Sequence, residues 1–154
     1  MPELGDVVPD FALYDYTKKL RQLSEFLMEG KKTIVAFYPG AYTGVCDQEM
    51  CAFRDMYSEL EKLNGSVVGI SVDAPWAQKN FATTYNIGFP LLCDFKREVI
   101  GKYGVVWKNL GGVEGYECAN RAIFVVDSSG KVLYKWVAPS PGTLPDFEAV
   151  KKAL

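Results

Sequence analysis

Apolar residues recur along this chain with two different periods, and segments of the two kinds alternate. Some segments are short and rich in β-branched and aromatic residues, which is typical of strands, whereas others repeat their apolar positions every three or four residues, which is typical of helices. The predicted strands are 11–14, 19–22, 33–39, 66–72, 89–92, 121–126 and 132–137. The predicted helices are 25–29, 45–63, 75–85, 96–103 and 144–154. Residues 107–119 show little periodicity and contain a Gly-Gly pair, which predicts a loop.

The order of these segments predicts the fold class. Strands that alternate with helices indicate an α/β sandwich, and the first two and last two strands are close enough to form hairpins. We therefore expect a thioredoxin-like fold, a mixed central sheet flanked by helices, with an N-terminal β-hairpin extension. The 154 residues contain no repeat or long linker, so we expect 1–154 to form a single domain.

Charge and hydropathy limit the partners. The net charge is −2, which argues against nucleic acid because phosphate binding favours a basic surface. No apolar stretch approaches the roughly 18 residues of a membrane span. The acidic N-terminus, interrupted by prolines, does not resemble a signal peptide, so we expect a cytoplasmic protein. Thiols are kept reduced there, and the four cysteines are then reactive, metal-binding or buried.

The chain contains no histidine, which excludes several kinds of site. A Ser-His-Asp triad, a Cys-His protease and any zinc site built on imidazole all require that residue. The cysteines also lack a Cys-x-x-Cys pair and zinc-ribbon spacing, so we expect no metal and no other cofactor.

Cys46 stands at the predicted start of the helix that follows a buried strand and a Pro-Gly turn. The partial positive charge of a helix N-terminus stabilises a thiolate, which is the nucleophilic form of cysteine. Asp47 and Glu49 lie in the same turn and oppose that charge, so a cation has to outweigh them. Among the four arginines, Arg121 begins an apolar strand and is the best candidate, and Glu49 would orient it.

Two segments of the sequence resemble the peroxiredoxin family. Pro39-Gly-Ala-Tyr-Thr-Gly-Val-Cys46 is similar to the family's active-site signature, and residues 47–55 continue in the manner of the bacterioferritin-comigratory (PrxQ-type) branch. Asn-Arg-Ala-Ile-Phe-Val-Val-Asp, residues 120–127, resembles the family's arginine strand and is also close to the one-cysteine AhpE-type branch. The resemblance covers nearly the whole chain.

The resemblance implies a thiol-dependent peroxidase that reduces hydrogen peroxide or organic hydroperoxides. Cys46 would be the peroxidatic nucleophile and become a sulfenic acid. Thr43 would hydrogen-bond the thiolate and the peroxide, Arg121 would lower the pKa of Cys46 and hold substrate, and Pro39 would shield the pocket from water. Each residue also has a structural interpretation: Thr43 as a helix N-cap, Arg121 as a surface charge, and Pro39 as the end of a strand.

In the PrxQ-type branch a cysteine at the position of Cys51 resolves the sulfenic acid as an intramolecular disulfide. In an intact helix, residues five apart have Cα atoms about 8.6 Å apart, and a disulfide spans no more than about 7 Å. The helix would therefore have to unwind before Cys46 and Cys51 could join. Two alternatives remain, resolution by Cys118 or a one-cysteine mechanism with an external thiol, whereas Cys93 is expected in the core.

The resemblance further implies a thioredoxin- or glutaredoxin-like reductant. It leaves both a monomer and a homodimer as expected assemblies. A thioredoxin-type thiol–disulfide oxidoreductase is a second class, but it would carry Cys-x-x-Cys at this helix start. A third class is a non-catalytic thioredoxin-like binding module, for which Trp76, Trp107 and Trp136 could supply an aromatic surface.

Overall fold

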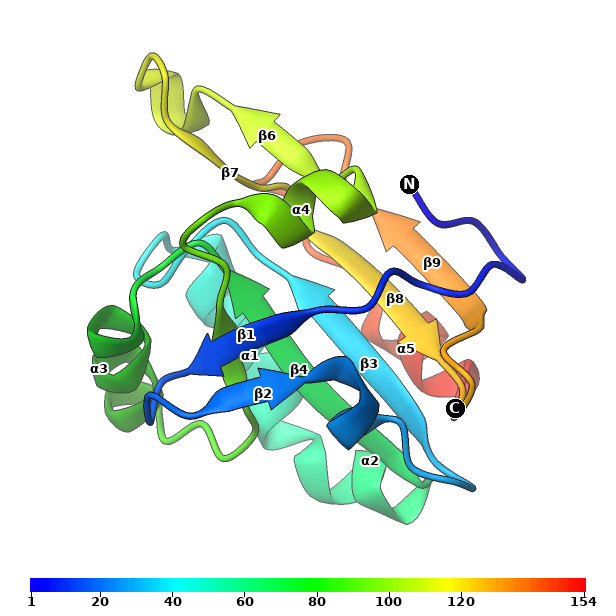
Figure 1. Ribbon diagram of the computed structural model, residues 1–154. Helices are drawn as coiled ribbons and strands as arrows, with labels where there is room; N and C mark the ends of the chain where they lie inside the picture. The colour runs from blue at the N-terminus through cyan, green and yellow to red at the C-terminus, as the bar shows by residue number, and fades with distance from the viewer.

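The computed structural model describes residues 1–154, except for the side chain of Cys46. Its centre is a seven-stranded mixed sheet in the order β2-β1-β5-β4-β3-β8-β9. Most of these strands are labelled in Figure 1. The strands are β1 (Ala12–Asp15), β2 (Leu20–Gln22), β3 (Lys32–Phe37), β4 (Gly65–Ser71), β5 (Leu91–Cys93), β8 (Ala122–Val126) and β9 (Val132–Val137). β3, β4 and β5 run parallel, whereas β1 and β8 are antiparallel to their neighbours β5 and β3. The predicted mixed sheet with an N-terminal hairpin is confirmed.

Helices cover both faces of this sheet (Figure 1). One apolar core lies under α1 (Val45–Asp55), α2 (Tyr57–Lys62), α3 (Pro75–Tyr85) and α5 (Phe147–Lys152), and the other lies under α4 (Glu98–Tyr103) and the 3-10 turn η1 (Leu23–Phe26). β3 supplies alternate residues to the two cores, because side chains of a strand point to opposite faces in turn. A central strand of this kind has to be apolar throughout, which is why its sequence gives so clear a signal.

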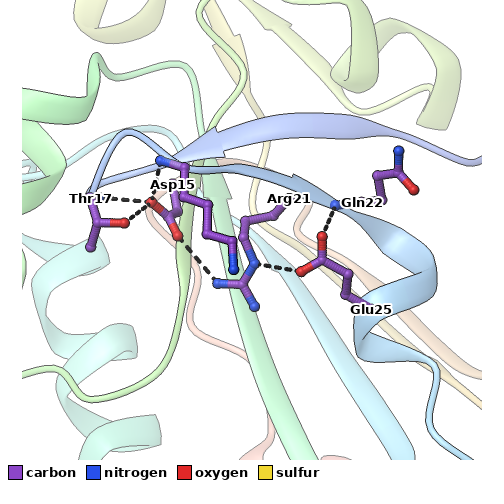
Figure 2. A network of polar contacts seen from close by, with 6 residues as sticks. Asp15, Thr17, Arg21, Gln22 and Glu25 are labelled. Atoms are coloured by element: carbon purple, nitrogen blue, oxygen red, sulfur yellow. Dashed lines mark hydrogen bonds and ion pairs between the residues drawn. The ribbon is translucent and has the colours of Figure 1, made fainter.

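The hairpin at the N-terminus is joined to η1 by a polar network (Figure 2). Arg21 lies between two carboxylates, with N–O distances of 3.2 Å to Asp15 and 2.7 Å to Glu25. Glu25 also accepts a hydrogen bond from the backbone N–H of Gln22, which is the N-cap of η1. The predicted helix 25–29 is wrong, since the structure has a four-residue 3-10 turn that begins earlier, at Leu23.

Two other predicted elements differ from the structure in kind, and several more differ only in their bounds, such as the predicted helix 144–154, which is α5 (Phe147–Lys152). The predicted helix 45–63 is interrupted at Met56, whose φ of −95° and ψ of 5° separate α1 from α2. The predicted loop 107–119 is a second, two-stranded sheet, formed by β6 (Val106–Lys108) and β7 (Glu117–Ala119) around the short η2 turn (Leu110–Gly112). Figure 1 shows this hairpin projecting beyond the main sheet.

Sheet topology brings three distant segments to one edge. Phe37, the last residue of β3, pairs with Ile70 near the end of β4 and with Ala122 at the start of β8. Three segments therefore meet at this edge. One begins at Tyr38, one begins at Val72 and one ends at Arg121. Ligand sites of open α/β sheets lie at the carboxyl ends of the parallel strands.

The three tryptophans do not form one aromatic surface. Trp107 and Trp136 are partly buried against the two cores, and Trp76 is the exposed one at 69% of its surface. Among the residues described, none of the helices combines the length and the hydropathy that crossing a membrane requires.

Candidate active site

Helix α1 begins where the resemblance places the nucleophile. Val45 is its first residue and Gly44 its N-cap, so Cys46 belongs to the first turn. The side chain of Cys46 lies outside the described part of the chain, and its predicted role stays a prediction. The first N–H groups of a helix have no partner within it, and Gly44 supplies no capping side chain. This helix start is therefore suited to stabilise negative charge.

The loop before α1 fixes the hydroxyl of Thr43. Its Oγ1 donates a hydrogen bond of 2.7 Å to the carbonyl oxygen of Gly40. The N-cap interpretation of Thr43 is wrong, because the cap is Gly44. With its proton engaged, the hydroxyl offers lone pairs, so in this state Thr43 can accept a hydrogen bond from a ligand but has no proton to donate.

A buried polar network from the end of β4 holds the same loop. One carboxylate oxygen of Asp73 accepts hydrogen bonds from the N–H of Ala41, at 2.8 Å, and from the hydroxyl of Ser71, at 2.7 Å. Gln78 joins this network by donating to Ser71 and by accepting from the hydroxyl of Tyr38 at 2.7 Å. The residues on either side of Pro39-Gly40 are thus both tied to the core. Asp73 was not predicted from the sequence, where its only signal is its position directly after a buried strand.

Arg121 is buried to 1% exposure, so its interpretation as a surface charge is wrong. Its Nε and Nη2 donate to the carbonyl oxygen of Pro141 at 3.1 and 2.8 Å, and its backbone N–H donates to the side chain of Asn120. A fork of donors on one acceptor fixes the plane of the guanidinium. The C-terminal loop therefore contributes to the site through a carbonyl group, which no side-chain pattern in the sequence predicts.

Glu49 is fully buried on α1 and faces Arg121, with 3.4 Å between Oε1 and Nη1. The sequence prediction that these two residues meet is confirmed, although neither carboxylate oxygen has a hydrogen-bond donor among the described residues. Burial raises the pKa of Glu49 to about 8, and the charge of Arg121 only partly offsets this. The carboxyl of Glu49 therefore keeps its proton to a higher pH than an exposed glutamate does, which reduces the negative charge that it presents to Arg121.

This burial predicts a pH-dependent stability. A pKa raised from 4.5 to about 8 on folding means that the stabilising state is the protonated one, so the free energy of unfolding decreases as pH rises between these values. We expect Glu49→Gln to lose this decrease, so that the stability of the variant relative to the wild type rises by on the order of 4 kcal/mol from pH 4.5 to pH 8. Urea unfolding of both proteins at a series of pH values measures the difference. A constant difference across this range would contradict the raised pKa.

A small pocket opens beside these groups, with a volume of about 130 Å³. It is lined by Pro39, Thr43, Val45, Leu110, Arg121, Pro141 and Gly142, and is called the Arg121 pocket below. Arg121 is the one charged residue of this described lining, and most of the other side chains are apolar. Sequence analysis predicted Pro39, Thr43 and Arg121 but missed Leu110 and Pro141, which come from segments far along the chain.

The other cysteines have different surroundings. Cys51 is half-buried on α1, and its partial burial raises the pKa of its thiol. Cys93 is buried at the end of β5, as predicted, with a pKa that burial raises to about 12. Cys118 is buried in the core that lies on the opposite face of the sheet from α1. The thiols of Cys51 and Cys93 are not part of a disulfide. Within the described residues, no cluster of three or more acidic or cysteine side chains could hold a metal ion.

Comparisons with known proteins agree with this geometry. Residues 4–135 match the model of the AhpC/TSA family. The chain is 37% identical over 135 residues to putative peroxiredoxin bcp of Coxiella burnetii, covering 87% of each protein. It is 34% identical over 128 residues to peroxiredoxin Bcp of Escherichia coli, covering 83% of this chain and 81% of the relative.

A solved structure extends the match to the fold. The crystal structure of peroxidoxin BcpB from Mycobacterium tuberculosis superposes with a TM-score of 0.84 at 34% identity, over 99% of this chain and 94% of that one. The predicted thioredoxin-like architecture is thereby confirmed. Since the family match spans most of the chain and the relatives are similar over most of their lengths, the chain belongs to the AhpC/TSA family and is a peroxiredoxin, a thiol-dependent peroxidase.

Proposed function

We propose that Cys46 reduces hydrogen peroxide and organic hydroperoxides by a two-step thiol mechanism. The observation that carries the proposal is the buried guanidinium of Arg121, which lines a pocket together with the loop and first turn that contain the cysteine motif. A cation at this place stabilises both a thiolate and the negative charge that develops as an O–O bond breaks.

In the first step the Cys46 thiolate attacks the terminal oxygen of the hydroperoxide. The S–O bond forms as the O–O bond breaks, and the leaving alkoxide or hydroxide takes a proton to become alcohol or water. Cys46 is thereby oxidised to sulfenic acid. The hydroxyl of Thr43 donates its hydrogen bond to Gly40. Its oxygen would accept a hydrogen bond from the O–H of the peroxide and so orient the substrate.

In the second step Cys51 attacks the sulfenic sulfur, water leaves and a Cys46–Cys51 disulfide forms. The location of Cys51 on the same helix supports this assignment, whereas Cys118 is buried across the sheet. A thioredoxin- or glutaredoxin-like dithiol would then reduce the disulfide. The proposal includes a cytoplasmic location, where such reductants are active.

One equivalent of hydrogen peroxide tests the scheme. We expect rapid loss of two thiols per chain, and non-reducing peptide mapping that links the Cys46 peptide to the Cys51 peptide. Cys46→Ser is the control and should lose no thiol on this time scale. Oxidation as slow as that of a free cysteine, or equal in the wild type and the control, would contradict the proposal.

The apolar lining of the Arg121 pocket predicts which kind of peroxide binds there more strongly. Leu110 lines the pocket from the η2 turn and could contact the organic group of a larger hydroperoxide. We expect Leu110→Ser to raise the KM for cumene hydroperoxide about five-fold, since each buried methylene contributes about 0.8 kcal/mol, and to leave the KM for hydrogen peroxide within two-fold. Steady-state kinetics with both substrates measures the ratio. An equal change for both peroxides would show that Leu110 does not contact substrate.

A further inference from the structure

One residue at the end of α3, Tyr85, contacts α1 at two places. Its hydroxyl donates a hydrogen bond of 2.7 Å to Oδ2 of Asp47. Its carbonyl oxygen accepts one of 2.7 Å from Nη1 of Arg54. Asp47 directly follows Cys46 in the chain, and Arg54 lies three residues beyond Cys51. The two contacts therefore hold both ends of the segment 47–54, which contains Cys51 and begins directly after Cys46.

The side chains of Asp47, Cys51 and Arg54 share one face of α1. Asp47 and Cys51 are four residues apart, and Cys51 and Arg54 are three apart, so the three are neighbours on the helix surface. The half-buried Cys51 is thus on the side of α1 on which Tyr85 lies. A helix that is held to α3 along this face cannot turn Cys51 toward the position of Cys46.

Disulfide formation requires that the contact break. The ideal-helix separation of about 8.6 Å between the Cα atoms of residues 46 and 51 has to shrink to about 7 Å or less. Unwinding this turn moves Asp47 relative to Arg54, and Tyr85 can then no longer keep both hydrogen bonds. Their strength is therefore part of the free energy that unwinding costs.

Other features keep that cost small. The first turn of α1 has no capping side chain, and the preceding loop holds Tyr42 at a φ of 62°, a left-handed conformation that is strained for a side chain of this size. Oδ1 of Asp47 is buried without a hydrogen-bond partner among the described residues, so it regains hydration when the turn opens. One hydrogen bond therefore contributes a large share of the free energy that keeps this first turn helical.

We propose that the hydroxyl of Tyr85 is a positioning group that keeps α1 wound while Cys46 reacts with peroxide and that releases Asp47 before Cys51 can react. This inference rests on the proposed function, in which Cys51 resolves the sulfenic acid. In that step Cys51 loses its proton, its sulfur bonds to the Cys46 sulfur, and the sulfenic S–O bond breaks to release water. The sulfenic acid itself is the oxidant.

The release rate decides between two fates of the sulfenic acid. A second peroxide converts a sulfenic acid that is still exposed to it into a sulfinic acid, which is inactive. Slow release of Asp47 lengthens this exposure, and fast release protects the enzyme. The contact of Tyr85 with Asp47 therefore sets the peroxide concentration at which the enzyme inactivates itself.

Tyr85→Phe tests this by removing only the hydroxyl. Stopped-flow fluorescence separates a second-order phase, the reaction with peroxide, from a first-order phase, disulfide formation. We expect the first-order rate constant to increase about five-fold, which corresponds to about 1 kcal/mol, the usual net strength of one hydrogen bond. The second-order rate constant should stay within two-fold. The peroxide concentration that gives half-maximal sulfinic acid, measured by intact mass, should rise about five-fold.

Tyr134→Phe on β9 is the control, since it deletes a tyrosine hydroxyl on another element. A general loss of stability would lower the melting temperature without accelerating the first-order phase, so that phase separates positioning from a structural role. An unchanged or slower first-order phase in Tyr85→Phe, with a normal disulfide in the wild type, overturns the inference alone. Absence of any Cys46–Cys51 disulfide in the wild type overturns the resolving step and the inference together.

Discussion

Replacing Arg121 by methionine is expected to lower the second-order rate constant for hydrogen peroxide by about 10²- to 10³-fold, the usual cost of removing one preorganised charge from a site where negative charge develops. Arg121 is the one cation of the described pocket lining. Asp47 directly follows Cys46, the proposed nucleophile, in the sequence, and the chain has no histidine to offset its charge. Without the guanidinium, the pKa of Cys46 should rise and the thiolate fraction at neutral pH should fall.

Stability and catalysis have to be separated in this experiment. Arg121→Met leaves Glu49 buried without its partner, and breaking one side of a buried ion pair costs about 3–5 kcal/mol when the remaining group stays charged. Because burial already raises the pKa of Glu49 to about 8, we expect the carboxyl to stay neutral and the loss to be smaller at pH 6. The double variant Arg121→Met/Glu49→Gln should be more stable than the single variant at pH 8 and equally inactive.

Arg97→Met is a matched control for loss of an arginine. Arg97 also donates a hydrogen bond to a backbone carbonyl, that of Glu117, but it is not among the residues of the Arg121 pocket. Stopped-flow oxidation should give the wild-type rate for this control. Arg121→Lys keeps the charge but not the fork of donors on Pro141, so an intermediate rate is expected. A rate for Arg121→Met within ten-fold of the wild type would refute the role of this charge.

Replacing Cys51 by serine is expected to leave the first step unchanged within two-fold and to lower steady-state turnover with a thioredoxin-like dithiol at least about ten-fold. The physical reason is that the sulfenic acid on Cys46 then has no neighbouring thiol to expel its oxygen. Trapping with dimedone and intact-mass measurement should show a stable sulfenic acid after one equivalent of peroxide, and sulfinic acid after an excess.

Cys118→Ser distinguishes the alternatives for resolution. Cys118 is buried in the core opposite α1, so this variant should lose some stability but keep the disulfide of the wild type. If Cys118→Ser, rather than Cys51→Ser, prevented the disulfide, resolution would belong to Cys118. If neither variant changed turnover, an external thiol would be the resolving group.

The sequence predicted those elements whose signals are local. α3 begins and ends at the predicted residues, because Pro75 suits a first turn and the apolar period ends where Asn86 adopts a left-handed conformation. The interruption at Met56 was missed, since apolar positions on both sides of it keep the same spacing and the period gives no sign of a break. The hairpin β6-β7 was missed because the Gly-Gly pair between its two short strands, and the weak periodicity around it, indicated a loop.

In the candidate site, too, some features could be predicted from the sequence and others could not. Side chains with distinctive chemistry, such as Arg121 and Glu49, could be paired from the sequence by asking what would outweigh the acidic residues near Cys46. The acceptor that fixes Arg121 is the carbonyl of Pro141, and a backbone group is the same for every residue type. The contact of Tyr85 with Asp47 depends on how α3 packs beside α1, which no pattern within either helix contains.

The interruption at Met56 limits how far a conformational change can spread. Helical hydrogen bonding is cooperative, so in one continuous helix from 45 to 63 the loss of the first turn would destabilise the turns after it. Here α2 begins separately at Tyr57 and keeps the buried Leu60 in the core. If α1 opens in each cycle as proposed, the opening can remain local and leave β3 and β4 covered, so that the apolar centre of the sheet is not exposed to aggregation.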